Sequence, residues 1–350
     1  MTLTCLKGMQ VSPRKYLKLY VTRPTLVSPR PPGPRPRRLN HHQLLPPEPY
    51  LRLAGVPHMT RPLPLILAQA PGRPADDLAG FTSDVERRVK LRAPGALVVY
   101  PELHLGESAP GVPAAPEKAA EPLDGKRDAA LAELAGDLGI WLVPGSVYER
   151  GADGRVHNTA PVYSPQGERL AAYRKICPWR PYETTAPGNR FEVVDLAGVG
   201  RIGLSICYDT WFPEVSRHLA WMGAELIVNV VRTPTSDRAQ EVVLSRANAI
   251  TNQVFVASVN SAAPSGIGRS LVVDPQGTVR AETVDAGDST LTDVIDLDEV
   301  SNVRRYGTAG LNRVWDQFRP GDAPLELPLY GGRIDPATWT AAHTTEEPPR

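Results

Sequence analysis

Residues 201–207 read RIGLSIC, and residues 208–214 continue as YDTWFPE. The first run is short and mostly apolar, which predicts a buried strand, and Pro213 is typical of the first turn of a helix. Cys207 is therefore expected between a strand and a helix. Backbone N–H groups at such a junction favour the thiolate, which is the nucleophilic form of cysteine. A strand cysteine on its own, however, is more often a small buried core residue.

Two further apolar segments place a charged residue where a predicted strand gives way to a loop. Residues 98–103 read VVYPEL and contain Glu102, and residues 170–176 read LAAYRKI and contain Lys175. Each charged residue also has a purely structural interpretation. Glu102 could cap the helix that follows its loop, and Lys175 could be a solvated strand end. Together with Cys207 these segments supply a carboxylate, an ammonium and a thiol. Such a set can act as general base, oxyanion stabiliser and nucleophile in covalent catalysis.

The order of four short segments resembles that of a known family. YPEL at 100–103, YRK at 173–175, and CYD at 207–209 with FPE at 212–214 resemble the three signatures of the nitrilase superfamily of carbon–nitrogen hydrolases. That family uses a Glu–Lys–Cys triad, which the resemblance assigns to Glu102, Lys175 and Cys207. PWRPYE at 178–183 resembles the loop that carries a second glutamate, here Glu183, in the amidase branch. The resemblance covers roughly residues 63–300.

These assignments predict a thiol amidohydrolase. Cys207 is expected to form a thioester acyl-enzyme, with Glu102 taking and returning the proton. Lys175 and the backbone N–H of Tyr208 are expected to stabilise the oxyanion, and Glu183 to position the substrate nitrogen or the hydrolytic water. The alternative is a nitrilase, in which the same triad adds water to a nitrile through a thioimidate. The amidase-like loop favours a small-molecule amide or N-carbamoyl substrate.

Aromatic and basic residues near the motifs are candidates for substrate binding. We predict that Tyr182, Tyr208 and Trp211 form pocket walls, although core packing explains such residues equally well. Arg232 directly follows a predicted strand over residues 226–231. Its guanidinium could bind a substrate carboxylate or form a structural ion pair, and both interpretations stay open here.

The alternation of apolar strands and amphipathic helices from Leu63 onward predicts a layered α/β domain. The resemblance narrows this to a four-layer αββα sandwich with two mixed sheets. We expect a disordered, basic, Pro-rich extension over residues 1–60 and a carbon–nitrogen hydrolase domain over residues 61–304. A C-terminal tail over residues 305–350 is expected to be mostly loop and to pack on the domain or on a partner subunit. The resemblance also implies a homo-oligomer, paired across the helix that follows Cys207.

The charge distribution is uneven. Residues 1–60 contain ten Lys and Arg, eleven Pro and a single acidic residue, Glu48. Such a segment buries too little apolar surface to offset the entropy of ordering it. It could be a nucleic-acid arm, a membrane-surface arm or a targeting peptide. We favour an upstream extension before a start at Met59, and we expect neither a nucleic-acid nor a membrane partner.

Composition limits the remaining possibilities. At 350 residues and 41% hydrophobic content the chain can bury a large core. No apolar run reaches the ~20 residues of a membrane span, which predicts a soluble protein. The chain has an odd number of cysteines, Cys5, Cys177 and Cys207, and they lack the spacing of a disulfide framework, which suits a reducing cytoplasm. Cys177 is interpreted as structural or incidental. No Cys/His pair has zinc-site spacing, so we expect no metal and no cofactor.

Overall fold

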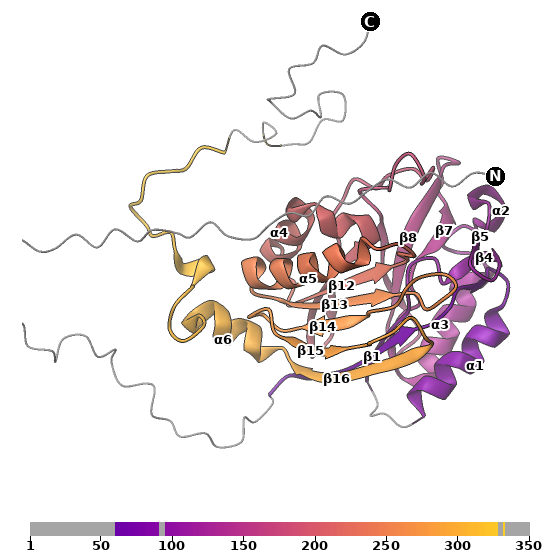
Figure 1. Cartoon of the computed structure of the whole chain (residues 1–350), viewed down its shortest axis with the longest axis horizontal. Coiled ribbons are helices and arrows are strands. Elements are labelled where there is room, and N and C mark those ends of the chain that lie inside the picture. Colours follow the sequence, from indigo (N-terminus) through magenta and orange to yellow (C-terminus); the bar gives the residue numbers. More distant parts are fainter. Residues whose placement is uncertain (1–59, 91–94, 328–331, 333–350) are drawn as a thin grey trace, which may run out of the picture. The chain divides into compact units, whose positions relative to one another are not determined.

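The computed structural model describes residues 60–90, 95–327 and 332 (Figure 1). Nearly all of the predicted basic extension, residues 1–59, and the end of the predicted tail, residues 333–350, lie outside the described residues. The domain boundaries expected from the sequence therefore stay predictions. The elements described below all fall within one compact unit, Pro57–Arg350.

One mixed sheet is built around parallel strands from the first half of the domain. Within the described residues it has seven strands in the order β16-β1-β3-β6-β8-β7, with β9 also paired to β8. β1, β3 and β6 run parallel, and the other pairs are antiparallel. The strands are β1 (Pro62–Gln69), β3 (Leu97–Val99), β6 (Trp141–Val143), β7 (Val147–Arg150), β8 (Val156–Tyr163), β9 (Arg169–Arg174) and β16 (Ser289–Asp296).

The second mixed sheet has six strands in sequence order from β10 to β15 in the described part of the chain. Its centre, β11–β12–β13, is parallel. The strands are β10 (Val193–Leu196), β11 (Gly200–Ile206), β12 (Leu226–Val231), β13 (Phe255–Asn260), β14 (Leu271–Val273) and β15 (Val279–Glu282). A small additional sheet joins β2 (Arg73–Pro74), β4 (Leu105–Ala109) and β5 (Val112–Pro113).

Helices cover the outer face of each large sheet (Figure 1). α1 (Leu78–Val89) and α3 (Lys126–Leu138) bury Phe81, Val85, Leu131 and Leu134 in one apolar cluster with β1 and β3. α4 (Pro213–Trp221) and α5 (Arg238–Asn252) form a second cluster with β12, β13 and β14. The other helical elements are α2 (Pro116–Ala119), α6 (Asp298–Tyr306) and the 3₁₀ helices η2 (Cys207–Trp211) and η3 (Val314–Asp316).

The largest apolar cluster lies between the two sheets. In β1, Leu63, Leu65 and Leu67 belong to this cluster, whereas Ile66 and Ala68 belong to the cluster under α1 and α3. Alternate residues of a strand point to opposite faces, so β1 is buried on both sides. On the facing sheet, Ile202, Leu204 and Ile206 of β11 complete the same interior. The predicted αββα sandwich is thereby confirmed.

Three local features differ from what the sequence indicates. The pattern over residues 140–148 predicts a single strand, but the structure has two, β6 and β7, separated at Gly145. Gly145 has φ +90°, and a Cβ there would lie 1.8 Å from the carbonyl oxygen of Pro101, so only glycine allows this approach to the loop carrying Glu102. β16 and α6 were not predicted, because β16 is mostly half-exposed and polar and so lacks a clear apolar period.

None of the helices in residues 60–90 and 95–327 combines the length and apolar character needed to cross a bilayer. The described part of the C-terminal tail lies on the surface. Leu325 is 69% exposed and Leu327 is 73% exposed, although both are apolar.

Candidate active site

The three motif residues meet because they follow strands of two facing sheets. Glu102 lies just beyond β3 and Cys207 immediately follows β11, so both are at the carboxyl ends of parallel strands. The backbone N–H of Glu102 donates to the carbonyl of Val231, the last residue of β12, at 3.3 Å. The backbone N–H of Leu103 donates to Ser146 Oγ at 3.0 Å. The first bond ties the Glu102 loop to the second sheet, and the second bond ties it to the turn between β6 and β7 of its own sheet.

Lys175 bridges two carboxylates directly after β9. Its Nζ lies 2.8 Å from Oε1 of Glu102 and 2.6 Å from Oε2 of Glu183, and its side chain is 2% exposed. Burial opposes the charge on Lys175, but the negative groups around it outweigh burial and hold its pKa well above the usual value. The lysine is therefore a fixed cation.

Asn158 on β8 was missed by sequence reasoning. Its Nδ2 donates to Oε1 of Glu102 at 2.9 Å and to Oε1 of Glu183 at 3.0 Å, and its backbone carbonyl accepts from the N–H of Lys175 at 2.9 Å. The side chain is fully buried. Asn158 thus fixes the positions of Glu102, Glu183 and Lys175 relative to one another. A polar residue in a strand buried along its whole length was the available signal.

Glu183 is more fully engaged than Glu102. Its carboxylate also accepts from the backbone N–H of Trp179 at 3.0 Å and from Thr185 Oγ1 at 2.8 Å, which makes four hydrogen bonds with those of Lys175 and Asn158. Burial raises the pKa of Glu183, but the opposing effect of Lys175 and these donors leaves it lowered. Within the described residues, the side-chain hydrogen bonds of Glu102 both go to Oε1. Oε2 of Glu102 is thus the oxygen left to accept a proton.

Cys207 has φ +47°, a conformation that non-glycine residues rarely adopt and that recurs at functional sites. Its sulfur lies 3.9 Å from Oγ1 of Thr233, and the backbone N–H of Arg232 stabilises its charged form. Burial, and then the charge of Glu102, nevertheless raise the pKa of the thiol well above its usual value, with Lys175 opposing.

The expected influence of a helix start on Cys207 is weak in the structure. The residue begins the short 3₁₀ helix η2, and α4 starts only at Pro213. The resting side chain is accordingly a neutral thiol. Cys177, by contrast, packs against the apolar cluster under α4 and α5, and burial raises the pKa of its thiol.

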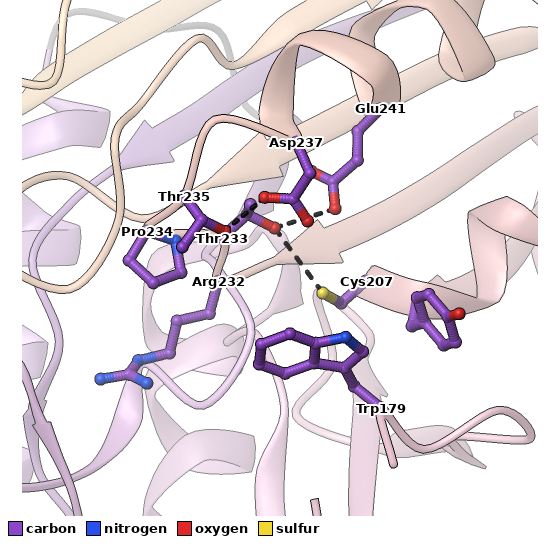
Figure 2. A pocket seen from close by; sticks show the side chains of 9 residues that line it. Trp179, Cys207, Arg232, Thr233, Pro234, Thr235, Asp237 and Glu241 are labelled. Carbon is purple, nitrogen blue, oxygen red and sulfur yellow. Dashed lines mark hydrogen bonds between the residues drawn. The ribbon is translucent and has the colours of Figure 1, made fainter. Parts of the chain in front are cut away.

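A cavity of about 30 Å³ opens beside Cys207. Figure 2 shows the thiol between the indole of Trp179 and the loop that leads from β12 to α5. Tyr208 and Arg232, two of the four predicted substrate-binding residues, line this cavity. The full lining is Trp179, Cys207, Tyr208, Arg232, Thr233, Pro234, Thr235, Asp237 and Glu241.

The other two predicted substrate-binding residues lie outside this lining. The ring of Trp211 packs against Tyr208, with 6.0 Å between ring centroids. Tyr182 is 73% exposed, and its ring packs 4.6 Å from that of Trp179. Both therefore contact a residue of the cavity wall and do not contribute to the wall directly.

Arg232 forms the structural ion pair that the sequence left as one of two possibilities. Its Nη2 lies 2.9 Å from Oε1 of Glu107, whose side chain is 1% exposed. Figure 2 shows the guanidinium pointing away from Cys207. The side chain borders the cavity, but its charge is already neutralised.

The sequence did not indicate the acidic residues of the cavity. Thr233 Oγ1 donates to Oε1 of Glu241 at 2.9 Å, and Glu241 is paired with the fully buried Arg238 at 3.1 Å. Burial and the neighbouring Asp237 raise the pKa of Glu241, with Arg238 opposing. The available signal was position, since residues just past the end of a central parallel strand face the same edge as Cys207. In the described parts of the chain, no group of three or more His, Cys, Asp and Glu side chains is arranged to hold a metal ion.

A comparison with models of protein families shows to which family the chain belongs. The model for carbon–nitrogen hydrolases matches residues 67–305. The chain belongs to the carbon–nitrogen hydrolase family. The position of Glu102, Lys175 and Cys207 inside the matched segment agrees with the resemblance drawn from the motifs.

Curated relatives are similar over about half of the chain. Nitrilase homolog 2 of Dictyostelium discoideum is 35% identical over 209 residues, which is 54% of this chain and 62% of that protein. Deaminated glutathione amidase of Rattus norvegicus is 34% identical over 207 residues, 53% of this chain and 63% of that protein. The chain thus spans less than two thirds of the length of these two relatives.

Solved structures match over a longer part. Nit3 of Saccharomyces cerevisiae, a member of branch 10 of the nitrilase superfamily, has a TM-score of 0.63 at 25% identity, covering 71% of this chain and 94% of that one. A variant of the amidase from Nesterenkonia sp. AN1, crystallised with butyramide, has a TM-score of 0.58 at 26% identity, covering 69% and 94%.

Proposed function

We propose that this protein is a thiol amidohydrolase that cleaves the C–N bond of a small, non-peptide amide or N-carbamoyl compound. The observation that carries the proposal is the buried bridge from Lys175 to Glu102 and Glu183, which lies close enough to Cys207 for the charges of Glu102 and Lys175 to act on its thiol. The arrangement supplies a nucleophile, a base and a fixed positive charge. Amides are poor electrophiles, so hydrolysis needs all three.

Acylation would start from the neutral thiol. Oε2 of Glu102 takes the proton of Cys207 as the sulfur attacks the carbonyl carbon. The resulting oxyanion is stabilised by the charge of Lys175 and by the backbone N–H of Tyr208. Collapse of the tetrahedral intermediate breaks the C–N bond, and Glu102 returns the proton to the departing nitrogen. Ammonia or an amine leaves, and a thioester remains.

Deacylation would use the same groups. Glu102 takes a proton from a water molecule that attacks the thioester carbon, and Lys175 again stabilises the oxyanion. The sulfur departs and regains the proton, which releases a carboxylic acid. Glu183, whose carboxylate already accepts four hydrogen bonds, is proposed to hold Lys175 and the Trp179 turn in place rather than to transfer a proton.

Nitrile hydrolysis is the second candidate, because the triad could add water to a nitrile through a thioimidate. The amidase names of the relatives, and the butyramide complex of a structural neighbour, support the amide. Incubation with amides, ureido acids and nitriles in parallel, with ammonia release as the measurement, tests the proposal. Turnover of amides or ureido acids is expected, and turnover of nitriles alone would contradict it.

We also propose that the protein acts as a homo-oligomer, without a nucleic-acid or membrane partner. Apolar side chains remain exposed on and beside α4, including Trp221 at 75% and Met222 at 43%, and in the tail at Leu325 and Leu327. A second copy of the chain would cover such surface. Light scattering on the full chain and on a chain ending near Pro320 tests this; a monomeric full chain would contradict it. The predicted cytoplasmic location remains a prediction.

A further inference from the structure

On one wall of the active-site cavity, four polar side chains present only hydrogen-bond acceptors to a ligand. Thr233 Oγ1 donates its hydrogen to Glu241 at 2.9 Å, and Thr235 Oγ1 donates its hydrogen to Asp237. A hydroxyl group has one hydrogen, so both threonine oxygens are left with lone pairs alone. Figure 2 shows these four side chains together on one side of the thiol. A ligand group that reaches this wall therefore has to supply N–H or O–H donors.

The same wall carries an uncompensated negative charge. Glu241 has a cationic partner, Arg238, at 3.1 Å. Asp237 has no ion-pair partner within the described residues, and although it precedes α5 its side chain makes no capping hydrogen bond there. The two carboxylates are close enough for the charge of Asp237 to raise the pKa of Glu241, after the larger effect of burial. A cation at this wall would relieve that repulsion.

A carboxylate would find no free cation in the cavity. Among the described residues that line it, only Arg232 is positively charged. Its Nη2 donates to Oε1 of Glu107 at 2.9 Å and to the carbonyl of Gly111 at 3.3 Å. An anionic ligand would have to compete with Glu107, whose side chain is 1% exposed and has no other cationic partner among the described residues.

The opposite wall also suits a cation. Figure 2 shows the indole of Trp179 on the other side of Cys207 from Asp237. The face of an indole ring attracts ammonium and guanidinium groups. A cation between this ring and the carboxylates of Asp237 and Glu241 would be attracted from both sides, whereas a neutral or anionic group would not.

We infer that the amidohydrolase proposed above prefers primary amides whose far end carries an ammonium or guanidinium group, and that Asp237 determines this preference. The inference rests on the proposed function for the position of the reacting amide at Cys207. An ammonium has three hydrogens to donate and one charge to offer. It satisfies the acceptor wall and compensates Asp237 at once.

A matched series of substrates tests the preference. The series has two to five methylene groups between a primary amide and a terminal ammonium, methyl or carboxylate group. We expect kcat/KM to be highest for the ammonium series at the best chain length. It should exceed the methyl analogue by about tenfold, as expected for one charge-assisted hydrogen bond. Equal rates, or faster turnover of the carboxylate series, would overturn the inference while leaving the amidohydrolase proposal intact.

A charge-matched pair of variants tests the assigned residue. Asp237→Asn should lower the ratio of kcat/KM for the ammonium substrate to that for the methyl substrate by about tenfold. Asp195→Asn removes the same charge from an exposed position on β10, paired with Arg201 at the opposite end of β11 from Cys207, and should leave the ratio unchanged. An unchanged ratio in Asp237→Asn would overturn the role of Asp237.

Binding can be measured without turnover. Alkylation of Cys207 by iodoacetamide, followed by peptide mass spectrometry, reports on occupancy of the cavity. Pentylammonium should slow alkylation at concentrations where pentanoate has no effect, and Asp237→Asn should abolish the difference. Better protection by pentanoate would overturn the inference. Should no amide of any charge be hydrolysed, the proposed function fails, and this measurement still decides the preference for cations by itself.

Discussion

The ammonium nitrogen of Lys175 lies 2.8 Å from Oε1 of Glu102, and both side chains are almost completely buried. In the proposed mechanism this pair determines which group accepts the proton. A lysine with such a partner stays charged and cannot act as a base, while the second oxygen of the carboxylate is proposed to accept the proton of the thiol. The two residues come from different strand pairs of one sheet, and Asn158 holds them in place.

Replacing the cation should impair both catalysis and folding. Lys175→Met keeps much of the side-chain length but leaves Glu102 and Glu183 facing each other without a positive charge. We expect kcat to fall by ~10² or more, from the lost oxyanion stabilisation, and stability to fall by about 3–5 kcal/mol. Steady-state kinetics and urea unfolding measure the two effects. Lys118→Met, at an exposed position on α2, is the matched control, and wild-type kcat in Lys175→Met would contradict the assignment.

Removing the base should act on the chemical steps. Glu102→Gln retains an oxygen that can accept from Lys175 and Asn158, but it cannot take the thiol proton. We expect kcat to fall by ~10² or more with a smaller change in stability. The same substitution at the exposed Glu117 serves as the control. A Glu102→Gln enzyme with near-normal turnover would rule out a base at this position.

The second glutamate should behave as a positioning residue. Glu183→Gln loses acceptor capacity toward Lys175 and the Trp179 backbone, so the turn and the lysine lose part of their support. We expect slower hydrolysis, with acyl-enzyme detectable by intact mass. The kcat–pH profile should keep its shape, because Glu183 is not proposed to transfer a proton. A profile that loses its acid limb would instead identify Glu183 as a base.

The buried His104 should make the stability of the protein sensitive to acid. The ring is 1% exposed between Phe81 and Tyr100, and neither ring nitrogen has a hydrogen-bond partner among the described residues. Burial, and then the charge of Arg73, lowers its pKa from 6.5 to about 3. The unfolded chain therefore binds a proton between these values and the native protein does not. Stability should fall as pH drops below about 6.5, at up to ~1.4 kcal/mol per pH unit.

A conservative substitution isolates the effect of His104. His104→Phe should reduce the loss of stability between pH 7 and pH 5, measured by urea unfolding at both values. His218→Gln, at an exposed position on α4, should leave that loss unchanged. The same pH dependence in His104→Phe and wild type would show that His104 does not contribute.

The sequence predicted those parts of the fold in which burial leaves a simple pattern. β12 has the predicted bounds, because a strand buried on both faces reads as a continuous apolar run. β16 does not show such a run, because most of its side chains are half-exposed. α6 was not predicted because it is short and has few apolar residues. Only Val300 and Val303 of this helix are buried.

The residues of the candidate site also differ in whether the sequence could indicate them. Glu102, Lys175 and Cys207 stand in recognisable motifs, so their proximity could be expected. Asn158 and Glu241 stand in no such motif, and their roles depend on which strands are neighbours. Asn158 reaches the site because β8 pairs with β9, and Glu241 because α5 follows β12, which lies beside β11. Such relationships become visible only when the sheets are assembled.

The covalent step is the central claim, and the mass of the intact protein during turnover tests it most directly. Rapid quenching with a slowly hydrolysed amide should give a population heavier by one acyl group, located at Cys207 by peptide mapping. Cys177→Ala should show the same adduct and retain turnover, whereas Cys207→Ala should show neither while remaining folded. An adduct on Cys177, or turnover that survives in Cys207→Ala, would contradict the account.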